Sequence, residues 1–139
     1  MQDYISRVID INQKMEDVTV KQFDGNSRAL HVQILNQSLG KNFPMLIEGC
    51  AALMYIDTGN SHSVLIAGEI ADGDNGIVFF IIPPAATQTA GDFPCEIRLT
   101  DASDDSVIST KIFTLHVEES IFDLDVTNVT ETEGEIRND

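Results

Sequence analysis

Histidine and cysteine side chains are the first candidates for chemistry, because they ligate metals and act as bases and nucleophiles. The chain has three histidines, His31, His62 and His116, and two cysteines, Cys50 and Cys95. No histidine has a histidine or cysteine two or four positions away, and the cysteines form no Cys-x-x-Cys pair, so the usual zinc spacings are missing. His31 and His116 could still meet across two strands. We expect histidines on the polar faces of a sheet.

An acidic turn is the next candidate. Residues 72–76 read DGDNG and superficially resemble a calcium loop. An EF-hand loop that began at Asp72 would need glycine at its sixth position and glutamate at its twelfth, where this chain has Ile77 and Pro83. The same residues are typical of a hairpin turn, which is what we predict.

Catalytic and phosphate-binding motifs are missing from the sequence. It contains no Gly-x-Ser-x-Gly elbow, no visible Cys-His-Asn arrangement, no GxGxxG and no P-loop. The sequence therefore predicts no catalytic residue, no metal and no cofactor. We expect a protein that is not an enzyme.

The net charge and the hydropathy of the chain exclude several classes of binding partner. The formal net charge is −15, from 23 acidic and 8 basic residues, so the domain should repel nucleic acids and anionic membranes. No segment approaches the roughly 20 apolar residues that cross a bilayer, and the first residues lack the apolar region of a signal peptide. We expect synthesis in a cytoplasm, no membrane insertion and two free, mostly buried thiols.

The elements that position these residues are strands, and the organising stretch is 76–100. Residues 77–82 are an apolar run that Pro83 and Pro84 end, a short turn or helical segment follows, and from Phe93 to Leu99 apolar residues alternate with polar ones. This pattern predicts two strands joined over the end of a β-sandwich.

Further strands are predicted on both sides of this stretch. They cover residues 4–12, 18–22, 30–34, 47–57, 64–71 and 107–118. Residues 36–44 read as a loop, and 47–57 are apolar on both faces, which predicts a central strand or one covered by a neighbouring subunit. We predict an all-β, antiparallel β-sandwich of about seven to eight strands in residues 1–122. Residues 123–139 should form an acidic, flexible tail.

Five segments carry a family resemblance. They are residues 18–22 (VTVKQ), 26–35 (NSRALHVQIL), 75–83 (NGIVFFIIP), 90–97 (AGDFPCEI) and 113–121 (FTLHVEESI). In their order and approximate spacing they resemble the N-terminal domain family of phage baseplate upper proteins, from tailed phages and prophages of Gram-positive bacteria. The resemblance implies an immunoglobulin-like sandwich in the virion, which docks to other tail-tip proteins and forms homo-oligomers, with a trimer as one option.

Two apolar surfaces are our candidate protein contacts. They are formed by Cys50, Ala52, Met54 and Ile56 on the doubly apolar strand, and by Ile121, Phe122 and Leu124 at the corner before the tail. The alternative function is a carbohydrate-binding or adhesive β-sandwich module, which aromatic side chains on one exposed face would favour.

Overall fold

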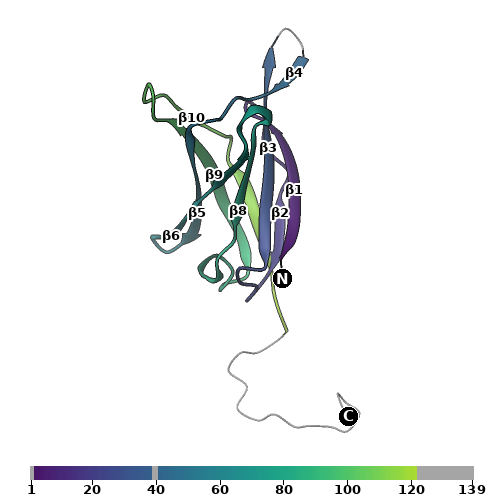
Figure 1. Ribbon diagram of the computed structural model, residues 1–139. Helices are drawn as coiled ribbons and strands as arrows, with labels where there is room; N and C mark the ends of the chain where they lie inside the picture. Colours follow the sequence, from purple (N-terminus) through teal and green to yellow (C-terminus); the bar gives the residue numbers. More distant parts are fainter. Residues whose placement is uncertain (1, 39–40, 122–139) are drawn as a thin grey trace.

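Alternating apolar side chains build two sheets whose inner faces pack together. The computed structural model describes residues 2–38 and 41–121 (Figure 1). The first sheet contains β1 (Asp3–Asp10), β3 (Arg28–Ser38), β4 (Lys41–Pro44), β7 (Glu69–Asp72) and β8 (Ile77–Ile81). The second contains β2 (Val18–Lys21), β5 (Cys50–Gly59), β6 (His62–Ala67), β9 (Gly91–Asp101), β10 (Val107–Ser109) and β11 (Phe113–Glu118).

The order of the strands is β1-β3-β8-β7 in the first sheet and β2-β11-β9-β5-β6 in the second. β4 pairs with the end of β3, and β10 pairs with β9. The predicted all-β sandwich is confirmed. The prediction that it is antiparallel throughout is wrong for two pairs, since β1 runs parallel to β3 and β2 runs parallel to β11. The chain runs along the first sheet in β1, returns along the second in β2, and comes back to the first in β3.

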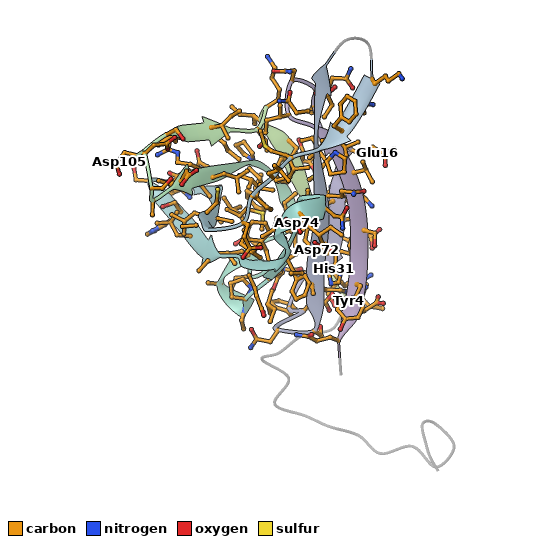
Figure 2. All side chains as sticks on the ribbon, turned by 45° about the horizontal axis from the view of Figure 1, so that its top comes forward. Tyr4, Glu16, His31, Asp72, Asp74 and Asp105 are labelled. Atoms are coloured by element: carbon orange, nitrogen blue, oxygen red, sulfur yellow. The ribbon has the colours of Figure 1, made fainter. Side chains whose placement is uncertain are left out.

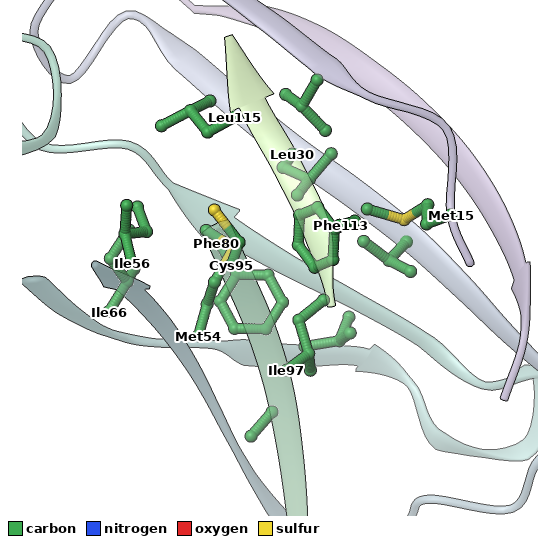
Figure 3. Close-up of a cluster of buried hydrophobic side chains, with 14 of the residues drawn as sticks. Met15, Leu30, Met54, Ile56, Ile66, Phe80, Cys95, Ile97, Phe113 and Leu115 are labelled. Carbon is green, nitrogen blue, oxygen red and sulfur yellow. The ribbon is translucent and has the colours of Figure 1, made fainter. Parts of the chain in front are cut away.

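The core lies between the two sheets and confirms the predicted inner faces (Figure 3). β3 contributes Leu30, Val32 and Ile34, each at most 1% exposed, and β8 contributes Val78 and Phe80. The second sheet faces them with inward side chains from β5, β9 and β11, which include Met54, Ile56, Cys95, Ile97, Leu99, Phe113 and Leu115. Full burial of one such side chain contributes about 1.5–3 kcal/mol, so this layer is the main source of stability.

The connection between β8 and β9 also agrees with the sequence. β8 ends at Ile81, and the short 3-10 turn η2 (Pro84–Ala86) begins with Pro84, whose missing N–H is not needed at that position. β9 then starts at Gly91 in the opposite sheet. The two strands are therefore joined over one end of the sandwich, as predicted.

Residues 64–71 form parts of two strands rather than the single predicted one. β6 ends at Ala67 in the second sheet and β7 begins at Glu69 in the first, so the chain crosses between the sheets at Gly68. A Cβ atom on Gly68 would lie 2.6 Å from Cε1 of Phe80. Glycine lets the chain turn close above the core at this point.

The predicted loop at 36–44 is wrong, because β3 and β4 continue as a two-stranded arm. Leu35 pairs with Pro44, Asn36 with Phe43, and the ladder continues to Ser38 and Lys41. The arm projects beyond the sandwich at the end opposite the N-terminus (Figure 1). The arm needs no apolar core in order to pair its backbone, so hydropathy did not reveal it.

The predicted last strand, 107–118, is interrupted by an irregularity. Ser109 lies opposite Arg98 and Phe113 opposite Cys95, so four residue steps of this segment face three of β9. Thr110 is buried at the interruption, where its Oγ1 accepts a hydrogen bond from the Ile97 N–H at 3.0 Å and its own N–H donates to the Ile97 carbonyl at 2.9 Å. The extra residue forms a β-bulge, in which the Thr110 hydroxyl replaces a backbone carbonyl as the acceptor for the Ile97 N–H.

Replacing Thr110 with valine should lower the free energy of unfolding by about 1–3 kcal/mol, because it leaves the buried Ile97 N–H without an acceptor while keeping the side-chain volume. Chemical denaturation followed by far-UV circular dichroism measures the change. Thr114→Val, on the half-exposed face of β11, is the matched control and should change stability by less than about 0.5 kcal/mol. Equal effects of the two variants would contradict this role of the hydroxyl.

Candidate interaction surfaces

The candidate chemical residues do not gather in one place. His31 is on β3 of the first sheet and His116 is on β11 of the second, so they do not meet across neighbouring strands. Within residues 2–38 and 41–121 no cluster of three or more histidine, cysteine, aspartate or glutamate side chains has the arrangement of a metal site.

His31 lies between two aromatic rings on the outer face of the first sheet (Figure 2). Its ring centroid is 4.4 Å from that of Tyr4, with a tilt of 56°, and 4.4 Å from that of Phe79, almost parallel at 11°. The three side chains stand side by side on β1, β3 and β8, and Tyr4 remains 58% exposed. Only the faces of His31 and Phe79 that stack on each other are covered in this row.

His116 forms an ion pair between two neighbouring strands of the second sheet, β11 and β9. Its Nδ1 contacts Oδ1 of Asp92, which is directly opposite it on β9. This hydrogen bond is the largest cause of a raised pKa for His116, and the carboxylates of Glu118 and Asp17 add to the rise while partial desolvation opposes it. The pair holds β11 to the start of β9.

The Asp92→Asn variant should lower the pKa of His116 toward its ordinary value of about 6.5. Because the folded-state pKa is raised, the stabilisation is complete below about pH 6.5 and disappears as the pH rises through the folded-state value. The difference in unfolding temperature between the wild type and this variant should therefore be largest under mildly acidic conditions. Titration of the imidazole by NMR measures the shift, with exposed Glu119→Gln as the control, and a difference that grew with pH would contradict it.

The acidic turn at 72–76 is occupied by its own hydrogen bonds (Figure 2). Asp72 caps the 3-10 turn η1 (Gly73–Asn75): its Oδ1 accepts from the Asn75 backbone N–H at 3.3 Å and its Oδ2 accepts from the Asn75 side-chain amide at 2.8 Å. Gly76 follows with φ of 70° and leads into β8. The predicted hairpin turn between β7 and β8 is confirmed.

Both cysteines are free thiols, as predicted. Cys50 lies opposite Asp101, whereas Cys95 lies opposite Ile56, six positions further along β5. At about 3.4 Å per residue the two are roughly 20 Å apart along the sheet, far beyond the ~7 Å that a disulfide tolerates between Cα atoms. Burial raises the pKa of the Cys95 thiol to about 12, and burial together with nearby Asp101 and Asp104 raises that of Cys50.

The predicted contact residues of β5 point into the domain. Ala52, Met54 and Ile56 are at most 4% exposed and pack in the core, and Cys50 is half-buried at the end of the strand. The opposite face of β5 is the exposed one, with Leu53 at 42% and Tyr55 at 46%. Ile121 is fully exposed, while Phe122 and Leu124 lie outside the described residues, as does the predicted tail. Any surface that β5 offers a partner is therefore its Leu53 and Tyr55 face.

This exposed side of the second sheet forms a shallow apolar groove, which we call the β5–β6 face. It is lined by Leu53, Tyr55 and Leu65, and bordered by Glu96 and Arg98. Leu65 on β6 is 64% exposed. Glu96 and Arg98 approach each other to 4.0 Å, so the two charges of the groove balance. The alternating pattern of 62–67 contains the signal for Leu65, which was not among the predicted contact residues.

A second apolar surface, the arm-end patch, lies beside the β3–β4 arm. Its exposed members are Phe43, Leu46, Val107 and Ile108, with Leu46 the most exposed at 75%. Met45, Ile47 and Cys50 line the groove between Leu46 and β10. Single exposed apolar side chains are ordinary on proteins, but three of these four, Leu46, Val107 and Ile108, line one groove, which is typical of a contact surface.

No helix in the described part of the chain is long and apolar enough to cross a membrane.

Comparisons with known proteins agree on the type of domain. The family model described as the BppU N-terminal domain matches residues 6–135. A solved structure, the N-terminal domain of phage TP901-1 ORF48, superposes with a TM-score of 0.66 at 17% sequence identity, covering 83% of this chain and 98% of that one. At this identity the similarity establishes a shared fold. A comparison with curated proteins found no match.

Proposed function

Because the chain belongs to the BppU N-terminal domain family of phage baseplate upper proteins, we propose that it is a non-enzymatic assembly module that docks to other tail-tip proteins and to copies of itself. The family match carries the proposal, since it extends from residue 6 to residue 135 and so includes the whole described sandwich from the middle of β1 onward. A phage baseplate domain functions as a component of the virion tail.

Two features of the surface support a docking role. The β5–β6 face and the arm-end patch both expose apolar side chains in a chain whose net charge is −15. Exposed apolar side chains of this kind are where a protein partner gains most from contact. The arm-end patch lies at the end of the sandwich opposite the N-terminus (Figure 1), so it stays accessible when that terminus is held. We assign docking to other tail proteins to this patch.

Several finer points remain part of the proposal. They are a sandwich domain that ends near residue 122, assembly contacts by Ile121, Phe122 and Leu124, and synthesis in the host cytoplasm. The family match continues to residue 135, beyond the proposed end of the sandwich. No catalytic residue is proposed.

Immunogold electron microscopy of phage particles induced from the source strain tests the function directly. An antibody raised against the chain should label the tail tip, and preimmune serum on the same particles is the control. Unlabelled particles, with the protein abundant elsewhere in the culture, would contradict the virion assignment. A glycan array would then test the adhesive alternative.

A further inference from the structure

We infer that the free edge of β6 pairs with the same edge of a second copy, so that two chains join their second sheets across a two-fold axis at Leu65. This contact specifies the self-association in the proposed function and rests on it. Its basis is the composition of the strand, the direction of its free backbone groups and the charge around it.

Edge strands invite pairing with other chains, and proteins guard them with charges, proline or short length. Three of the four strands that end the two sheets carry such charges: β1 has Asp3, Arg7 and Asp10, β2 has Lys21, and β7 has Glu69 and Asp72. β6 reads HSVLIA and contains no aspartate, glutamate, lysine, arginine or proline; its one titratable side chain is His62, at the first position of the strand. It is thus the least guarded of these four edges.

Other short strands do not offer the same opportunity. β10 also lacks a charge, but it is three residues long and follows Asp104 and Asp105 in the chain. At β1, the Arg7 guanidinium reaches over the edge and donates to the Asp17 carbonyl at 2.7 Å. β6 is six residues long, which is enough for a short ladder.

One hydrogen bond determines which backbone groups of β6 point toward the open edge. The Gly68 N–H donates to the Ala52 carbonyl at 2.8 Å, which makes these two a hydrogen-bonded pair in the β5–β6 ladder. Bonded and non-bonded pairs alternate in an antiparallel ladder, so Ile66 and Val64 also bond to β5. The N–H and C=O groups of Ser63, Leu65 and Ala67 therefore point away from β5, toward the open edge.

These three residues form a self-complementary set. In an antiparallel pair centred on Leu65, each Leu65 bonds to its symmetry mate, while Ser63 of one copy bonds to Ala67 of the other and the reverse. Backbone groups of both copies are thereby satisfied without any change in either chain. The two Leu65 side chains, each 64% exposed in one copy, come together on the outer face of the joined sheet.

The charge on this edge is low. Two chains that each carry a net charge of −15 repel each other over most of their surfaces. β6 itself contains no aspartate, glutamate, lysine or arginine. The carboxylate of Asp57 lies one strand back, opposite Ser63 on β5, so no carboxylate stands on either of the two paired strands.

Cross-linking of the full 139-residue chain tests the symmetry of the contact. In a Cys50→Ser background, Leu65→Cys should form a disulfide between copies under mild oxidation, because a bonded antiparallel pair holds its Cα atoms about 5.5 Å apart. Leu53→Cys is the matched control: it lies on the same face, but three strand spacings, about 14 Å or more, separate it from its mate. A non-reducing gel should show dimer for Leu65→Cys only.

Sedimentation velocity over a range of concentrations tests the association itself. The wild-type mass should rise from 15.3 kDa toward twice that value, Leu65→Lys should stay monomeric because it places two ammonium groups at the axis, and Leu53→Lys should associate like the wild type. A wild-type chain that stays monomeric throughout, a three-fold mass, or equal cross-linking of Leu53→Cys would overturn the inference. Labelling of the tail tip would be unaffected by such a result, so failure of this contact is distinguishable from failure of the baseplate function.

Discussion

Replacing Gly76 with alanine is expected to destabilise the domain by about 3–4 kcal/mol, a large share of the total stability of a domain of this size. Gly76 has φ of 70°, a left-handed conformation that costs a residue with a Cβ about 1–2 kcal/mol. An added Cβ would also lie 2.5 Å from the Ile34 carbonyl oxygen and 2.9 Å from that of Met45. Both neighbours are backbone atoms, so the strands themselves have to move.

The movement would break hydrogen bonds at the base of the arm. The Ile34 N–H donates to the Gly76 carbonyl, and the Met45 N–H donates to the Ile34 carbonyl, each at 2.8 Å. Gly76 therefore joins the β7–β8 turn to the point where the arm returns toward β5. We expect Gly76→Ala to loosen the arm-end patch as well as the sandwich.

Gly49→Ala is the matched control, because Gly49 has a similar φ of 82° and an added Cβ there meets no atom within 4 Å. It should cost only the conformational strain, about 1–2 kcal/mol. Denaturant unfolding by far-UV circular dichroism suits a chain that has no tryptophan. If the two variants were equally stable, the close packing of Gly76 against Ile34 would not be an energetic constraint.

The inner faces of the sandwich could be predicted because their signal is local. Buried apolar residues alternate with polar ones on β3 (Leu30, Val32, Ile34) and on β9 (Cys95, Ile97, Leu99). This period of two directly reflects the geometry of a strand with one buried face. The signal for the end of β8, a double proline, is equally local. These features together specify the sandwich and its core.

The remaining features depend on distant parts of the chain. Whether β1 runs parallel to β3 depends on a crossing through the other sheet, and the crossing at Gly68 depends on Phe80, which lies twelve positions away. The arm pairs polar residues that carry no hydropathy signal, and the bulge at Thr110 replaces a backbone acceptor with a hydroxyl. No local pattern contains this information.

The candidate contact surface shows the same limit. Residues 50–56 are apolar on both faces, so a period of two cannot say which face is buried. Packing against the first sheet selects Ala52, Met54 and Ile56, and leaves Leu53 and Tyr55 outside. The sequence shows that β6 lacks aspartate, glutamate, lysine and arginine. That this leaves a sheet edge unguarded could be inferred only once β6 was known to be an edge strand.

Phe80→Ala should cost about 3–5 kcal/mol, the second large effect that we expect. Phe80 is completely buried, pairs with Leu30 across β3 and β8, and lies under the crossing at Gly68. Truncation leaves a cavity between the sheets at the point where β6 passes into β7. The loss should therefore reduce the order of the β6 edge along with the overall stability, and hydrogen exchange of the β6 amides should accelerate more than that of β11.

Phe79, the neighbour of Phe80 on β8, is the matched control, because it is also a phenylalanine but does not point into the core. Phe79 points to the outer face, where its ring stacks on His31, so Phe79→Ala removes an aromatic contact worth about 0.5–1.5 kcal/mol and leaves no internal cavity. Both variants delete the same atoms from adjacent positions of one strand. We expect the losses of unfolding free energy of the two variants to differ by about 2 kcal/mol or more in denaturant unfolding. Of these two phenylalanines, Phe80 is the one that packs between the sheets. Equal losses would mean that the outer stack of Tyr4, His31 and Phe79 contributes to stability as much as the core does.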